Sequence, residues 1–162
     1  MIFKKQKIEM KVKKQLCTFY VNGFYFGVDV LRVQEVIKYQ KMTPVPVSPA
    51  VVKGLINLRG QIVIAVDMRE KMGMPPRENQ QLPMNVVVHS DEGAISLLVD
   101  KIGDVIEVDD KDLEAPPDSL NGVNRDLLLG VYKLPKTLLL SMNVDEAINI
   151  CQVMSKDEMQ SY

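Results

Sequence analysis

Few residues in this chain could act as a nucleophile, a base or a metal ligand. His89 is the sole histidine, and it follows a run of valines, where a place beside a turn is favoured over a role as a base. A Ser-His-Asp arrangement would need His89 at its centre. Without a second histidine or a cysteine cluster, no zinc site can be drawn. The sequence therefore predicts no catalytic residue and no metal site.

The other groups that could carry chemistry have simpler interpretations. The acidic run at residues 109–114 lacks the glycine and the spacing of a calcium loop, so a solvated helix start is favoured. Neither G-x-x-x-x-G-K-[ST] nor G-x-G-x-x-G occurs, so no nucleotide cofactor is expected. Cys17 and Cys151 are interpreted as buried, reduced thiols. An enzyme that uses His89 as a base stays a competing hypothesis. A His89→Ala variant that keeps every cellular function would exclude it.

Length and charge limit the possible classes of function. The chain has 162 residues, with 20 Lys and Arg against 21 Asp and Glu, which suits one domain or two small packed ones. This balance gives no global field that would attract nucleic acid. No run has the length of a membrane helix, and the N-terminus lacks the apolar stretch of a signal peptide. These features predict a cytoplasmic protein without membrane insertion.

The Lys-rich leader at residues 1–14 suggests one further alternative. We interpret this leader as a flexible, solvated segment. A nucleic-acid-binding barrel that used it would bind in a strongly salt-dependent way. Lysines do not alternate with Tyr20, Phe24 and Tyr25, so packing of these aromatic residues within the first hairpin is favoured and no nucleic acid partner is expected.

Short segments of alternating or continuous apolar residues, separated by turns, predict an all-β barrel or sandwich with minor helix. The clearest hairpin signal is Asn22-Gly23, because both central residues of a type I′ turn need positive φ. The expected strands are residues 15–21, 24–28, 35–39, 62–66, 84–89, 94–99, 103–108, 127–134 and 137–142.

The segments between these strands carry several local expectations. The proline-bearing residues 43–49 form an extended connector, and Pro49 begins a short helix that reaches Val52 or Lys53. The strand at 62–66 is buried on both faces. Asp67 then caps a helix over residues 69–72.

An internal echo suggests two lobes of similar plan. A buried strand runs into Val66-Asp67 and then a helix, and another runs into Val144-Asp145 and then a helix at 144–154.

Val30, Val33 and Val36 recur with three-residue spacing beside Glu35. On spacing alone such a stripe packs into the core. The alternative is an apolar groove that accepts a partner helix.

Taken together, five segments resemble the CheW family of bacterial chemotaxis coupling proteins. The most specific is residues 53–60 with residues 62–69, which contain G-x-x-N-L-R-G-x-I. Residues 26–37 look like the family's first-lobe motif, residues 43–46 its connector, and residues 99–105 its second-lobe motif. The similarity extends over about residues 15–150.

The resemblance implies a fold, a function and partners. The fold would be two five-stranded SH3-like β-barrels that share an apolar core, over residues 15–152, with a tail at 153–162. The protein would be a non-enzymatic adaptor without cofactor. It would couple the cytoplasmic tip of chemoreceptors to the regulatory domain of the histidine kinase CheA, in membrane receptor arrays. A chain that starts at Met1 and lacks a phosphoacceptor domain fits a free-standing coupling protein.

The resemblance also implies two groups of site residues. A receptor helical hairpin would lie in a groove between the lobes. Its expected residues are Leu16, Val30, Val33, Glu35, Val36 and Ile106. Coupling to the kinase would involve Gly54, Asn57 and Arg59, with Glu35 and Arg59 paired across the groove wall.

Overall fold

The structure is a computed structural model that describes residues 13–150. These residues form ten strands in two five-stranded sheets, joined by short helical turns, so the predicted all-β fold of two small lobes is confirmed. Most of the expected leader, the expected tail and Cys151 lie outside the described residues. Lys14, assigned to the leader, already begins the first strand.

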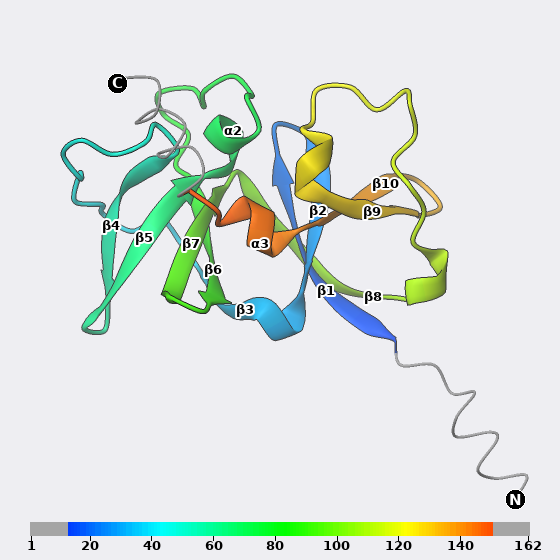
Figure 1. The fold of residues 1–162 in the computed structure, drawn as a ribbon, viewed down its shortest axis with the longest axis horizontal. Helices are drawn as coiled ribbons and strands as arrows, with labels where there is room; N and C mark the ends of the chain where they lie inside the picture. The colour runs from blue at the N-terminus through cyan, green and yellow to red at the C-terminus, as the bar shows by residue number, and fades with distance from the viewer. Residues whose placement is uncertain (1–12, 151–162) are drawn as a thin grey trace, which may run out of the picture.

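The first lobe has the strand order β8-β1-β2-β10-β9, and the second has β3-β6-β7-β5-β4 (Figure 1). The strands of the first lobe are β1 (Lys14–Val21), β2 (Phe24–Asp29), β8 (Lys101–Val108), β9 (Leu128–Lys133) and β10 (Leu138–Met142). Those of the second are β3 (Val33–Ile37), β4 (Val52–Leu58), β5 (Gln61–Asp67), β6 (Met84–Ser90) and β7 (Gly93–Val99). Short helical turns connect them: η1 (Val30–Arg32), α2 (Met68–Lys71), η2 (Asp110–Asp112), η3 (Arg125–Leu127) and α3 (Val144–Ala147).

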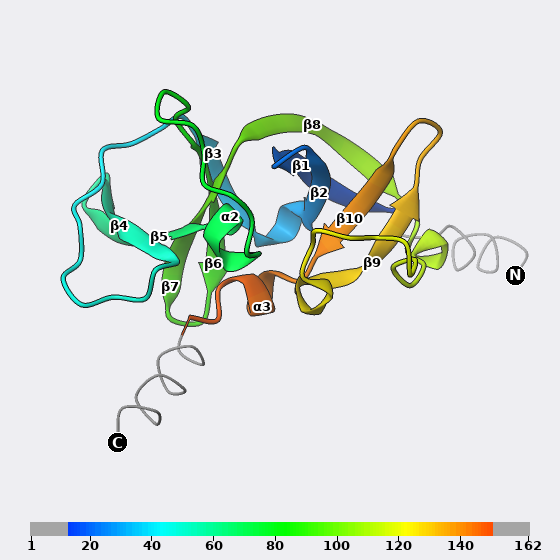
Figure 2. The same cartoon turned by 90° about the horizontal axis from the view of Figure 1, so that it is seen from above.

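Each lobe is completed by a strand that the chain delivers from the other lobe. The hairpin β1–β2 belongs to the first lobe, yet β3, which follows it through η1, pairs with β6 of the second. Conversely, β8 follows β7 of the second lobe and pairs with β1 of the first. Figure 2 shows β8 arching from one lobe to the other. Neither lobe is therefore a closed folding unit of consecutive residues.

Strands that are buried on both faces contribute side chains to three apolar clusters. Along β1, Leu16 points into the interior of the first lobe, whereas Cys17 and Phe19 point into a core shared by both lobes. In the second lobe, Val87 faces the lobe interior and its neighbours Val86 and Val88 face the shared core. This alternation follows from the period of two in a strand. The lobes are thus joined by apolar packing as well as by the chain.

The internal echo of the sequence has a structural counterpart. β5 pairs in parallel with β7, and β10 pairs in parallel with β2, so the two strands hold equivalent places. Each is followed by a short helix, capped by Asp67 in the second lobe and by Asn143 in the first. The second cap is Asn143 because its side chain accepts the Glu146 amide, and Asp145 lies inside the turn.

Several local predictions differ from the structure. Ile62 is exposed, so the predicted strand at 62–66 is not buried on both faces along its whole length. Pro49 begins a turn in which its carbonyl accepts the Val52 amide, and the chain then enters β4 without a helix. The last helix ends at Ala147, and the predicted part beyond residue 150 lies outside the described residues. The strand expected at 35–39 spans Val33–Ile37.

At the crossover from β7 to β8, the carboxylate of Asp100 connects the two lobes. It accepts the Asn22 amide of the β1–β2 turn at 2.7 Å and two nitrogens of Arg69 from α2, with Nη2 at 2.7 Å. Burial alone raises the pKa of Asp100. The Arg69 and Asn22 hydrogen bonds, together with the charge of Arg77, lower that pKa by more, so it lies below its ordinary value. Folding therefore favours the ionised form.

This pKa shift predicts how stability depends on pH. Because the folded-state pKa of Asp100 is depressed, its contribution is present above the ordinary value of 3.8 and is lost as pH falls through the folded-state pKa. Urea unfolding at successive pH values should show the free energy of unfolding falling more steeply for the wild type than for Asp100→Asn, from about pH 5 downward. Parallel curves would contradict this assignment.

Candidate functional site

The valine stripe lies at the seam between the lobes. Val30, Val33 and Val36 are half-buried and pack against the shared core with one side only. Val33 pairs with Val88 and Val36 with Val86, and a register shift at Gln34 separates the two pairs. This β-bulge lets residues three apart face the same way in a strand. The stripe is therefore part core and part surface.

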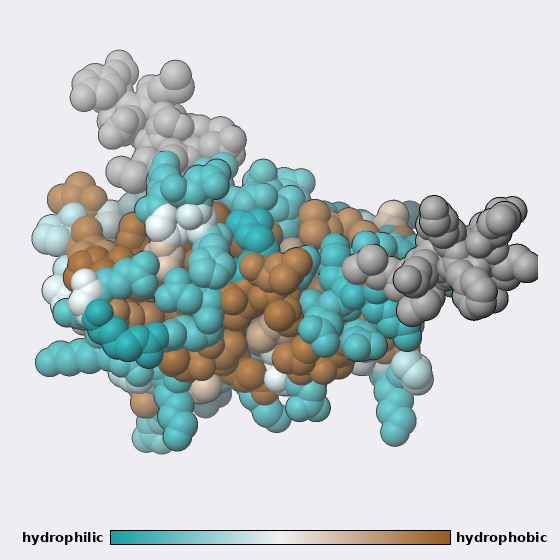
Figure 3. All heavy atoms as spheres, turned by 90° about the horizontal axis from the view of Figure 1, so that it is seen from below, coloured by the Kyte–Doolittle hydropathy of each residue, from teal (hydrophilic) through white to brown (hydrophobic). Residues whose placement is uncertain are grey.

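The turn η1 adds an exposed apolar side chain that the sequence analysis did not single out. Leu31 is 85% exposed, and it stands between Val30 and Arg32 at the crossover from β2 to β3. Figure 3 shows apolar groups gathered in the middle of the face that carries η1. We call Val30, Leu31, Val33 and Val36 the seam surface. Its signal in the sequence was a leucine that broke the valine spacing, in a turn capped by Asp29.

A hollow of about 280 Å³ adjoins this surface. It is lined by Lys13, Lys14, Gln15, Asp29, Val30, Leu31, Glu107 and Asp110. Apolar groups from η1 thus lie beside both positive and negative side chains from β1 and β8. Such a mixture suits an amphipathic protein segment better than a small apolar ligand.

Leu16 and Ile106 do not join the seam surface. They are cross-strand neighbours, and both belong to the cluster inside the first lobe. Leu16 is only 1% exposed, so it offers a partner almost no surface. Leu16 also lines the hollow beneath Arg32, so its place in the groove stays a prediction, although the alternation of β1 turns most of its side chain into the lobe interior. Ile106 keeps partial exposure but lies on that same cluster.

Glu35 and Arg59 form an ion pair, as the sequence analysis expected. Glu35 lies in β3 directly beside the seam surface, whereas Arg59 belongs to the tight turn between β4 and β5. Arg59 and Gly60 both have positive φ, which is the geometry of a type I′ hairpin. Arg59 is exposed and Glu35 is mostly buried. The pair therefore links the β4–β5 turn to the edge strand next to the seam.

The remaining two predicted residues have structural roles in the same hairpin. Asn57 is exposed, and its Oδ1 accepts the Gly60 amide at 3.0 Å. Gly54 is buried beneath the connector, where an added Cβ would lie 2.7 Å from the Thr43 carbonyl oxygen. Gly54 can therefore shape a neighbouring surface but presents none itself. In the first lobe, Gly130 makes the equivalent close approach to Glu114.

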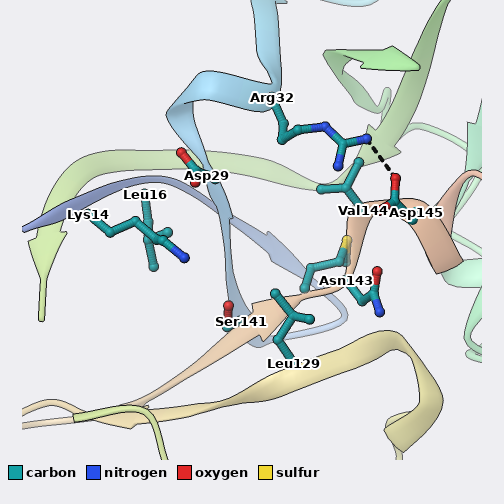
Figure 4. A pocket seen from close by; sticks show the side chains of 10 residues that line it. Lys14, Leu16, Asp29, Arg32, Leu129, Ser141, Asn143, Val144 and Asp145 are labelled. Carbon is teal, nitrogen blue, oxygen red and sulfur yellow. Dashed lines mark hydrogen bonds and ion pairs between the residues drawn. The ribbon is translucent and has the colours of Figure 1, made fainter. Parts of the chain in front are cut away.

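On its other side, η1 is connected to α3 by an ion pair between Arg32 and Asp145. Arg32 donates to Asp145 at 2.9 Å and to the His89 carbonyl at 3.1 Å. Figure 4 shows the Arg32 side chain running from η1 to Asp145, above a hollow bordered by Lys14 and Leu129. His89 thus takes part through its backbone at the end of β6. The pair spans the seam between the lobes and is open to water.

The profile of the CheW-like domain matches residues 15–152. The chain belongs to the CheW family. Among its relatives, the chemotaxis protein CheW of Rhizobium meliloti (strain 1021) is 30% identical over 132 residues, covering 82% of this chain and 85% of that protein. The CheW protein of Bacillus subtilis (strain 168) is 28% identical over 153 residues, covering 94% of each chain. These relationships identify a chemotaxis adaptor or scaffold.

The three-dimensional comparison agrees with the sequence comparison. The crystal structure of the scaffolding protein TtCheW from Thermoanaerobacter tengcongensis superposes with a TM-score of 0.73 at 25% identity, covering 82% of this chain and 90% of that chain. The fold predicted from the resemblance is therefore confirmed. Within residues 13–150, no three His, Cys, Asp or Glu side chains are grouped so as to hold a metal ion. No helix in that part of the chain is long and apolar enough to cross a membrane.

The burial of the seam surface predicts different tolerance at neighbouring positions. Leu31→Asp should change the free energy of unfolding by no more than about 0.5 kcal/mol, because the side chain is exposed. Val33→Asp should lower it by about 1–3 kcal/mol, because a carboxylate would then meet the shared core. Urea titrations followed by circular dichroism measure both. Equal losses in the two variants would show that the seam surface is not divided in this way.

Proposed function

We propose that this chain couples chemoreceptors to the histidine kinase CheA and so helps to regulate the kinase in signalling arrays. The observation that carries the proposal is the seam surface, where Leu31 is exposed beside three half-buried valines in a chain of the CheW family. A solvent-exposed apolar turn at a crossover contributes little to folding. It does provide side chains that a partner helix can bury.

The receptor side of the proposal is a helix-in-groove contact. The cytoplasmic tip of a chemoreceptor is expected to lay its apolar face on Val30, Leu31, Val33 and Val36. Each well-buried aliphatic side chain contributes roughly 1.5–3 kcal/mol before ordering costs are subtracted. A few such contacts suit affinities in the micromolar range, and linkage in an array adds avidity.

The kinase side is expected to involve the β4–β5 hairpin of the second lobe. Its turn presents Asn57 and Arg59, and Gly54 fixes the shape of the strand beneath the connector. Because Arg59 pairs with Glu35 at the seam, a change on the receptor side can alter the hairpin. Two binding partners are coupled when one of them has a different affinity for the two conformational states of the chain that the other partner favours. The chain itself makes or breaks no bond in this scheme.

The first test concerns receptor binding. Leu31→Asp should reduce co-sedimentation with receptor-containing vesicles, because it places a charge in the apolar contact. Leu82→Asp is the matched control, since Leu82 is also exposed but lies in the loop between α2 and β6. Unchanged binding by Leu31→Asp, or an equal loss in the control, would remove the seam surface from the receptor contact.

The second test concerns coupling. Arg59→Ala should fold normally, because the side chain is exposed, yet should give weaker kinase activation in a reconstituted receptor–kinase assay. Lys53→Ala, an exposed change on β4, the strand that leads into the Arg59 turn, serves as its control. Wild-type activation by Arg59→Ala would refute the coupling role of the Glu35–Arg59 pair.

A further inference from the structure

We propose that Asp100 is a positioning residue that fixes the orientation of the two lobes relative to each other, and with it the geometry of the seam surface. The consequence for receptor binding rests on the proposed function, whereas the effect on lobe orientation does not. Asp100 lies where the chain leaves β7 of the second lobe and enters β8 of the first. Its contacts reach into both.

In the first lobe, Asp100 is held by the backbone of the β1–β2 hairpin. Its carboxylate accepts the Asn22 amide at 2.7 Å, and its own amide donates to the Tyr20 carbonyl at 2.9 Å. Both contacts use the same residue, one through the side chain and one through the main chain. The tip of the hairpin is therefore fixed to the crossover at two points.

In the second lobe, two arginines converge on the same carboxylate. Arg69 of α2 contacts both of its oxygens, and Arg77 donates from Nε to Oδ1 at 2.7 Å. Arg77 also donates to Asp67 at 2.8 Å and to the Leu98 carbonyl at 3.1 Å. The loop between α2 and β6, the start of α2 and the end of β7 are thereby joined to one group.

The burial of this network, whose ionised carboxylate also contributes to stability, bears on its geometric role. The Asp100 side chain is 7% exposed, and those of Arg69 and Arg77 are 12% and 8% exposed. A buried ion pair repays its desolvation only when its geometry is held closely, so it is weak support for a gain in stability. Directional hydrogen bonds from several segments do restrict relative motion. We therefore assign the network to orientation.

The other crossover is fastened much more loosely. There, the Arg32–Asp145 pair has side chains that are 34% and 77% exposed. Exposed pairs hold their geometry weakly and are screened by salt. The seam is thus fixed at the Asp100 edge and adaptable at the η1 edge. A receptor helix can adjust the seam surface while the lobes keep a common pivot.

The test measures the distance between the lobes in the folded protein. Spin labels are attached to Lys53→Cys in the second lobe and Lys136→Cys in the first, both exposed, in the 162-residue chain with Cys151→Ser, where the one native thiol left is the buried Cys17. Double electron–electron resonance then compares the wild-type network with Asp100→Ala. We expect Asp100→Ala to broaden the distance distribution, and Asp145→Asn, as the control, to leave it unchanged.

Several outcomes would decide the proposal. A distribution of unchanged width in folded Asp100→Ala, even with reduced stability in urea, would overturn it, as would equal broadening in the control. If Asp100→Ala does not fold, Arg77→Met removes one arginine from the same carboxylate and must broaden the distribution instead. An unchanged width in that variant would also overturn the proposal.

A receptor measurement separates this inference from the proposed function. Where the distribution broadens, affinity for receptor vesicles should fall by about fivefold or more, as expected for a site shaped by a coupled element. Broadening with undiminished receptor affinity would overturn the link to the seam surface. Failure of the wild type to bind receptors would refute the proposed function but leave the role of Asp100 in lobe orientation standing.

Discussion

Burial of strands on both faces is the constraint on which the rest of this structure depends. Because β1, β6, β7 and β10 present alternate side chains to a lobe interior and to the shared core, neither lobe can satisfy its apolar surface alone. The exchange of β3 and β8 between the lobes has the same consequence for the backbone, since each sheet needs a strand from the other side. The two lobes are one folding unit as a result.

This constraint also creates the seam surface. Where the chain crosses from β2 to β3, it must leave one sheet and enter another, and the short turn η1 does so with Leu31 facing solvent. Val33 and Val36, which follow, can pack against the shared core with one side only, because β3 is the edge strand of its sheet. A half-buried apolar stripe is therefore a product of the crossover. At the opposite crossover, from β7 to β8, the chain is held by the hydrogen bonds and ion pairs of Asp100, whose side chain is buried.

The sequence predicted the elements better than their surroundings. Nine of the ten strands, the Asn22-Gly23 turn and the Asp67 cap depend on local chemistry, and the structure confirms them; β4 (Val52–Leu58) was not among the predicted strands. The Glu35–Arg59 pair was also expected, through the family resemblance and the opposite charges. Such features can be assigned from a few neighbouring residues.

What could not be predicted depends on contacts between distant segments. The burial of Leu16 follows from which face of β1 meets the first-lobe interior, which spacing alone does not decide. The bulge at Gln34 explains the three-residue valine spacing, but only the pairing of β3 with β6 reveals it. The Asp100 network joins residues from three separate segments, and no single motif announces it.

We propose that the seam surface receives a receptor helix while the lobes stay folded around it. Methyl-resolved NMR of the intact chain, titrated with a soluble fragment of a chemoreceptor tip, tests this claim most directly. We predict that adding the fragment changes the chemical shifts of the methyl groups of Val30, Leu31, Val33 and Val36. The methyl groups of the first-lobe interior, such as those of Leu139, should keep their chemical shifts. Shifts confined to the outer ends of the lobes, or none at all, would contradict it.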